Sequence, residues 1–86
     1  MNELTGKVAL ITGAGKGAGR LLAQAFAERG ASVAANDISP INVEPVVEQI
    51  DASGGRARVY IEDVAKKLGA QYIIKQVEDD FGRIDI

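Results

Sequence analysis

The sequence predicts an α/β fold, in which one parallel sheet lies between two layers of helices. Short apolar runs alternate with longer segments of helical periodicity along the 86 residues. A glycine-rich turn follows the first apolar run, and glycine follows each helical segment, as is common at helix C-termini. Strands and helices that alternate in this way form parallel sheets with right-handed crossovers. We therefore expect residues 1–86 to form a single β-α-β-α-β-α-β unit.

The first predicted strand covers Lys7–Thr12, a short run with β-branched members that is typical of a strand buried on both faces. A helix is expected over Ala18–Arg29, with Gly30 after its end. The second strand covers Ser32–Asn36 and runs into Asp37. The central residues of both strands are apolar, which is typical of the interior of a parallel sheet.

The second helix ends near Ala52, but two positions could begin it. Ser39 followed by Pro40 offers a capping residue and a proline in the first turn, and Asn42 offers a second cap. If the helix begins at Pro40, we expect Pro45 to disturb its first two turns, because proline lacks the N–H that a helix interior needs.

The third strand, Arg56–Ile61, alternates polar and apolar residues and is therefore expected at a sheet edge. A third helix follows, from Val64 or Lys66 to Asp80, and residues 83–86 begin a fourth strand. The predicted architecture is a three-layer parallel sheet with strand order 3-2-1-4, the first half of a doubly wound fold. Because the fourth strand is incomplete, we expect a fragment or a shortened chain.

Composition excludes several kinds of chemistry. The sequence contains no His and no Cys, so Ser-His-Asp triads, thiolate nucleophiles and Cys/His zinc sites are excluded. This composition leaves an all-carboxylate Mg²⁺ site open, but we predict no metal site. The net charge is −2 and the ten basic residues are dispersed, which argues against a nucleic-acid surface. No apolar run approaches the roughly 20 residues that span a bilayer, and residues 1–4 lack the basic-then-apolar order that is typical of a signal peptide. We expect a cytoplasmic protein without membrane partners.

The turn from Thr12 to Gly19 lies between a strand and a helix, which is the context that a dinucleotide-binding turn requires. Glycines allow positive φ and let backbone N–H groups approach a pyrophosphate, and the helix N-terminus attracts the same anion. A nucleotide-hydrolase loop is excluded, because Lys16 precedes Gly17 rather than Ser or Thr. The turn therefore predicts a Rossmann fold.

Asp37 ends the second strand about 20 residues after the turn, where a carboxylate accepts hydrogen bonds from the adenosine ribose. Its charge repels a 2′-phosphate, so it favours NAD over NADP. Lys16 acts in the opposite direction, since a basic residue in the turn can reach that phosphate. We predict NAD as the cofactor, because the strand end lies directly beside the ribose.

Asp63 and Val64 follow the third strand at the same edge of the sheet. Two interpretations remain open for this pair. Asp63 could meet the exocyclic amine of adenine while Val64 contacts the ring, or Asp63 could cap the third helix.

Four segments together resemble the N-terminal part of the short-chain dehydrogenase/reductase family: residues 12–19, 36–38, 63–64 and 81–86. The resemblance covers essentially the whole chain and implies a nicotinamide dinucleotide as cofactor. Ala18 departs from the family, which usually has Ile or a similar residue there. By this resemblance the cofactor-binding residues are Gly13, Gly15, Lys16, Gly17, Ala18, Asp37, Ile38, Asp63 and Val64.

The same resemblance implies an inactive chain. The family's catalytic Asn, Ser, Tyr and Lys have no match, and Tyr72 and Lys75 are three residues apart rather than four. We therefore expect an NAD-binding half-domain without catalytic residues, which forms a homodimer through its incomplete sheet edge. The alternatives are a structural half-domain that retains no ligand binding, and a fragment of an NADP-preferring reductase.

Overall fold

A computed structural model describes residues 2–86. Its elements are β1 (Val8–Ile11), α1 (Gly17–Glu28), β2 (Ser32–Asp37), α2 (Pro40–Ala52), β3 (Arg56–Ile61) and α3 (Lys67–Phe81). Each begins and ends close to the position expected from the sequence. Within residues 2–86, no helix combines the length and apolarity that a membrane crossing requires.

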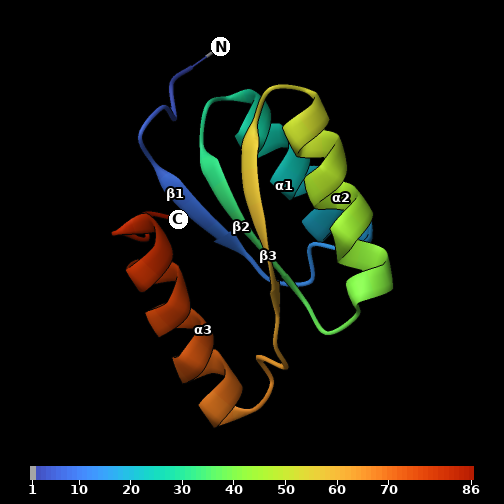
Figure 1. Ribbon diagram of the computed structural model, residues 1–86, viewed down its shortest axis with the longest axis vertical. Helices are drawn as coiled ribbons and strands as arrows, with labels where there is room; N and C mark the ends of the chain where they lie inside the picture. Colours follow the sequence, from blue (N-terminus) through green and yellow to red (C-terminus); the bar gives the residue numbers. More distant parts are fainter. Residues whose placement is uncertain (1) are drawn as a thin grey trace.

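The three strands form a parallel sheet in which β2 lies between β1 and β3. Ser32 pairs with Val8 on one side and with Arg56 on the other, so the strands begin and end almost level. Helices α1 and α2 cover one face of the sheet, and α3 covers the other (Figure 1). The predicted three-layer α/β architecture is confirmed, as is the edge position of β3.

Alternate residues of the strands supply two separate cores. Val33 and Ala35 of β2 face α1 and α2, together with Val43, Val47 and other apolar side chains of that layer. Ala34 faces the opposite way, toward Ile73 and Val77 of α3. Burial on both faces explains why β2 is apolar from Val33 to Ala35, since the sheet is covered by a helix layer on each side.

Residues 83–86 lie along the edge of β1 that β2 leaves free. The N–H of Asp85 donates to the Val8 carbonyl at 2.8 Å, and the N–H of Leu10 donates to the Ile86 carbonyl at 3.0 Å. This segment occupies the position expected for the fourth strand, although no strand is assigned to it. The order 3-2-1 is therefore observed, and the fourth place stays a prediction.

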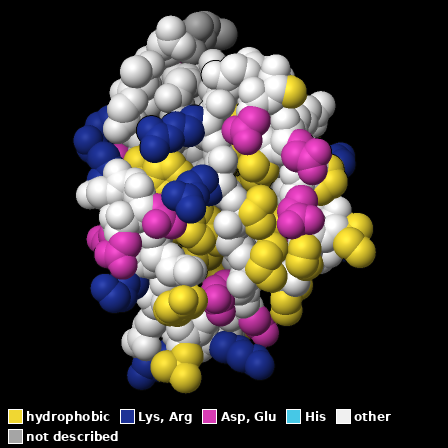
Figure 2. All heavy atoms as spheres, in the orientation of Figure 1, with side chains coloured by type: hydrophobic (Ala, Val, Ile, Leu, Met, Phe, Trp, Pro, Cys, Tyr) yellow, Lys and Arg dark blue, Asp and Glu magenta, His cyan; other side chains and the backbone are white. Residues whose placement is uncertain are grey.

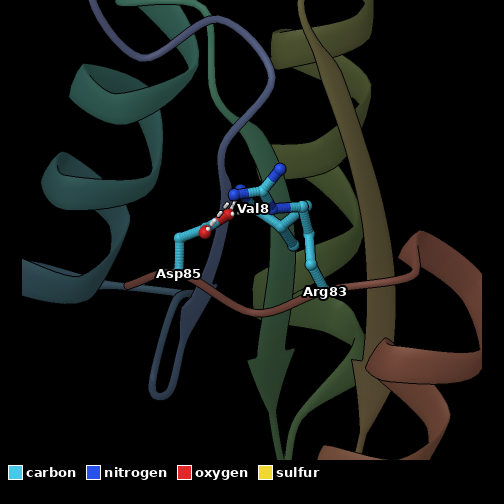
Figure 3. A network of polar contacts seen from close by, with 3 residues as sticks. All are labelled: Val8, Arg83 and Asp85. Carbon is cyan, nitrogen blue, oxygen red and sulfur yellow. Dashed lines mark hydrogen bonds and ion pairs between the residues drawn. The ribbon is translucent and has the colours of Figure 1, made fainter.

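The Asp85 side chain fastens this segment to the sheet (Figure 3). Its carboxylate accepts the N–H of Val8 at 2.8 Å and two hydrogen bonds from the Arg83 guanidinium, at 2.7 and 2.8 Å. The Arg83 bonds, followed by that of Val8, hold the pKa of the Asp85 carboxyl below its ordinary value.

The expected disturbance of the second helix by Pro45 was wrong. Helix α2 begins at Pro40 and continues through Pro45 to Ala52 without interruption. The carbonyl that Pro45 leaves without a helical partner belongs to Ile41, which is 83% exposed, so it can turn to solvent instead. Helix α3 begins at Lys67 with Lys66 as its N-cap, which agrees with the later of the two expected positions.

Candidate functional site

The carboxyl ends of the three strands meet at one edge of the sheet, at the bottom of the view in Figure 1. An open hollow of about 220 Å³ lies at this edge. It is lined by Gly13, Asn36, Asp37, Ile38, Glu62, Asp63, Val64 and Ala65. Acidic and hydrophobic side chains adjoin each other at this end of the molecule (Figure 2). Ligands of open α/β sheets bind in crevices of this kind.

The glycine turn connects β1 to α1 beside the hollow. Gly13 has φ +63° and Gly17 has φ +60°, a backbone conformation in which residues other than glycine are strained. Glycine is required at position 19 for a different reason, because a Cβ there would collide with the carbonyl group of Gly13. The turn is tied to β2 by the N–H of Ala14, which donates to the Asn36 carbonyl at 2.8 Å.

The N-terminus of α1 is open. The helix begins at Gly17 with Lys16 as its N-cap, and no side chain accepts a hydrogen bond from its first N–H groups. No acidic residue lies in its first turn, so nothing there opposes an anion. Lys16, Gly17 and Ala18 are all exposed. These residues present backbone donors and one positive charge to the solvent beside the hollow.

Asp37 connects the turn to the start of α2. Its Oδ2 accepts the N–H of Gly15 at 2.9 Å, and its Oδ1 accepts the N–H of Ser39 at 3.0 Å. The bond from Ser39, with those from Gly15 and the charge of Lys16, holds the pKa of the Asp37 carboxyl below its ordinary value, although partial burial opposes this. Asp37 is therefore an oriented carboxylate with lone pairs left to accept further hydrogen bonds.

Asn36 was missed by the sequence analysis as a residue of the site. Its side chain is 1% exposed, and its Nδ2 donates to the Tyr60 carbonyl at 3.0 Å and to the Glu62 carbonyl at 3.1 Å. These bonds fix the end of β3 against the end of β2. The only signal in the sequence is a polar residue at the end of an apolar strand.

Asp63 and Val64 line the same hollow as Asp37. The Asp63 carboxylate accepts the N–H of Ala65 at 3.0 Å, and Lys66, not Asp63, is the N-cap of α3. The capping interpretation of Asp63 is therefore wrong. Val64 packs against the core beneath α3, whereas Ile38, which also lines the hollow, is 65% exposed.

The structure thus brings five of the nine expected residues into one hollow: Gly13, Asp37, Ile38, Asp63 and Val64. Gly15 adjoins it through its hydrogen bond to Asp37. Among the residues described, no three His, Cys, Asp or Glu side chains gather closely enough to hold a metal ion.

Fold and hollow together define an α/β protein of the Rossmann type, with an open crevice at the carboxyl edge of its sheet. Residues 7–86 match the model of the short chain dehydrogenase family, and the chain belongs to this family. It is 52% identical over 81 residues to an uncharacterized oxidoreductase of Thermotoga maritima, a match that covers 94% of this chain and 32% of that protein. The chain thus spans about a third of the length of the curated relatives it matches.

Solved structures of the family share the fold. A xylitol dehydrogenase with bound NAD⁺ has a TM-score of 0.92 and 33% identity, over 98% of this chain and 32% of that one. A metagenomic short-chain oxidoreductase in complex with NADP also has a TM-score of 0.92, with 29% identity over 96% of this chain and 38% of that one. The family to which the chain belongs therefore includes proteins that bind either dinucleotide.

Proposed function

We propose that this chain binds the adenosine and pyrophosphate of NAD at the carboxyl edge of its sheet, as the cofactor-binding half of a dehydrogenase. The observation that carries the proposal is the position of Asp37. Its carboxylate ends β2, borders the hollow and is oriented by two backbone N–H groups. A ribose diol is a pair of donors that such a carboxylate accepts.

The residues present fit a dinucleotide. Gly13, Gly15 and Gly19 keep the turn free of side chains that would fill or distort it, and the uncapped start of α1 offers N–H donors to a pyrophosphate. Ile38 and Val64 supply apolar surface to the hollow, against which an adenine ring would lie. Bound NAD would supply the nicotinamide that exchanges hydride with a substrate.

The preference for NAD rests on charge. A 2′-phosphate beside Asp37 would meet a carboxylate that is held ionised, and unit charges about 4 Å apart repel by roughly 1–4 kcal/mol. Lys16 favours the alternative, an NADP-binding chain, because its charge is close enough to influence Asp37. We assign NAD because Asp37 lines the hollow and Lys16 does not.

We further propose that these 86 residues do not transfer hydride by themselves. Tyr72 is exposed on α3, and Lys75 on the same helix pairs with Asp79 at 3.5 Å. Neither residue lines the hollow, so neither can act as an acid or base there.

The cytoplasmic location expected from the cysteine-free sequence also stays a prediction.

Replacing Asp37 with alanine tests the binding proposal. The change removes charge-assisted hydrogen bonds to the ribose, which contribute roughly 1.5–3 kcal/mol, so NAD affinity should fall about 10- to 100-fold. Isothermal titration calorimetry measures this. Asp51→Ala, an exposed position near the far end of α2, is the matched control and should bind NAD as the wild type does. Equal NAD affinity in both variants would contradict the role of Asp37.

We also propose that the chain forms a homodimer through the side of the sheet where residues 84–86 lie. Leu21 and Leu22 of α1 are 63% and 48% exposed, and Ile86 beside β1 is 46% exposed. Exposed apolar surface next to a sheet edge favours association, and a two-fold dimer is its simplest form.

Light scattering after size-exclusion chromatography tests the dimer. At micromolar concentration the chain should elute with twice its mass of 9.0 kDa. Leu21→Glu should shift it to the monomer, whereas Leu68→Glu on α3, at a position 80% exposed on the opposite face, should not. A stable wild-type monomer would rule out this assembly.

A further inference from the structure

Gly15 differs from the other glycines of the turn. Gly13 and Gly17 have positive φ, but Gly15 does not, so its backbone conformation is open to any residue. The space around it is not. A Cβ at position 15 would lie 2.7 Å from Oδ2 of Asp37 and 2.7 Å from Cβ of Asn42. Glycine is therefore required here by the close approach of two neighbours and not by the turn itself.

One of these neighbours is the carboxylate of the proposed ribose site. The oxygen that a Cβ would touch is the same Oδ2 that accepts the Gly15 N–H at 2.9 Å. Any side chain at position 15 would thus push Asp37 away from the donor that orients it. The carboxylate lies at the end of a side chain and yields more readily than Cβ and the backbone carbon of Asn42, so Asp37 is displaced most, with a smaller shift of the start of α2.

We propose that Gly15 is a positioning residue that determines cofactor choice: because it has no Cβ, its N–H holds Asp37 against the rim of the hollow, where that carboxylate accepts a free 2′-hydroxyl and rejects a 2′-phosphate. The inference rests on the proposed function. It adds that the discrimination depends on immobilising Asp37 from both sides, through Gly15 on one oxygen and Ser39 on the other. A carboxylate released from Gly15 can turn away from a phosphate, which relieves the repulsion.

Gly15→Ala tests the proposal through two readouts. The affinity for NAD should fall about tenfold while the affinity for NADP changes less than threefold, so the preference for NAD narrows. In a carbon-detected NMR titration, the pKa of the Asp37 carboxyl should rise toward its ordinary value, because a donor to the ionised form is lost. A merely structural role would weaken both dinucleotides equally.

Gly55→Ala is the matched control. Its Cβ would lie 2.8 Å from Cγ2 of Ile50, an equally tight contact, and Gly55 also lacks a positive φ, but it precedes β3 at the opposite end of the sheet. This variant should leave both the NAD preference and the pKa of Asp37 unchanged. If Gly55→Ala alters them as Gly15→Ala does, the effect is one of general destabilisation and the proposal is wrong.

A second variant separates the two neighbours and covers a failure of Gly15→Ala to fold. Adding Asn42→Gly removes the closest contact with α2, that with Asn42 Cβ, and leaves the contact with Asp37 and a looser one, 3.0 Å, with the backbone carbon of residue 42. The double variant should still show a raised pKa of Asp37 and a narrowed preference. If Asn42→Gly restores both to wild-type values, Gly15 serves the packing of α2 and the proposal is overturned. If the wild type binds no NAD, the proposed function is wrong, and so is the role of Gly15 in cofactor choice. The pKa of Asp37, compared between the wild type and Gly15→Ala, then still tests separately whether the Gly15 N–H orients this carboxylate.

Discussion

Gly19→Ala is expected to abolish dinucleotide binding. Alanine improves helix propensity at this position of α1, so the helix itself should tolerate the change. The new Cβ, however, would overlap the carbonyl carbon and oxygen of Gly13, and the turn must open to make room. Opening withdraws the N–H groups that face a pyrophosphate. Losing two hydrogen bonds to a charged group, each worth roughly 1.5–3 kcal/mol, lowers affinity by more than about 100-fold.

The matched control is Ala25→Gly, an exposed position farther along α1. It costs helix stability by about 0.5–1 kcal/mol but leaves the turn unchanged, so NAD binding should persist. Calorimetry on both variants, after circular dichroism shows that each is folded, makes the comparison. Wild-type affinity in Gly19→Ala would mean that the dinucleotide does not use this turn.

Asn36→Asp is expected to cause the largest loss of stability. The two side chains have nearly the same shape, but a carboxylate cannot donate. It would direct an oxygen at the carbonyls of Tyr60 and Glu62, at a position that is 1% exposed. Leaving buried groups without hydrogen bonds costs about 1–3 kcal/mol each, and more for a charge. For a domain of this size, Tm should fall by more than about 10 °C at neutral pH.

The loss in Asn36→Asp should depend on pH. Burial raises the pKa of the introduced carboxyl above its value in the unfolded chain, so the folded state binds the extra proton. Stability relative to the wild type should therefore recover as pH falls through the raised pKa and decline again as pH rises. Asn2→Asp, at an exposed position, should show neither effect. Thermal melts between about pH 4 and 8, the range in which raised carboxyl pKa values fall, test this dependence. A difference in Tm between Asn36→Asp and the wild type that does not change with pH would contradict the burial argument.

The order of the elements was predictable because its signals are local. Apolar runs such as Val33–Ala35 and the glycine after each helix are properties of adjacent residues, and these fixed strands and helices to within a few positions. The position of the glycine turn was equally predictable from the sequence, since positive φ at Gly13 and Gly17 is a local backbone requirement.

The features that failed or were missed depend on contacts between distant segments. In the sequence Asn36 is one more residue of a strand. Its side-chain amide finds a hydrogen-bond partner only in the folded chain, where it donates to the carbonyl of Tyr60, 24 positions later on β3. The close approach of Asn42 and Asp37 to Gly15 is likewise a product of the folded chain. Asp63 had the spacing of a cap, but the loop before α3 is longer than expected, so the carboxylate serves the turn at Ala65.

The central claim is that NAD occupies the hollow at the carboxyl edge of the sheet, and amide NMR during an NAD titration tests it most directly. The account predicts that the N–H signals of Gly13, Gly15 and Asp63 shift with a single saturable affinity. Those of Gln49 and Gly55, which line a separate hollow between α1 and α2, should stay fixed. Signal shifts confined to the hollow between α1 and α2 would contradict binding at the carboxyl edge. The absence of any shift in a folded chain at millimolar NAD would contradict it too, because a binding free energy of roughly −4 kcal/mol is detectable at that concentration.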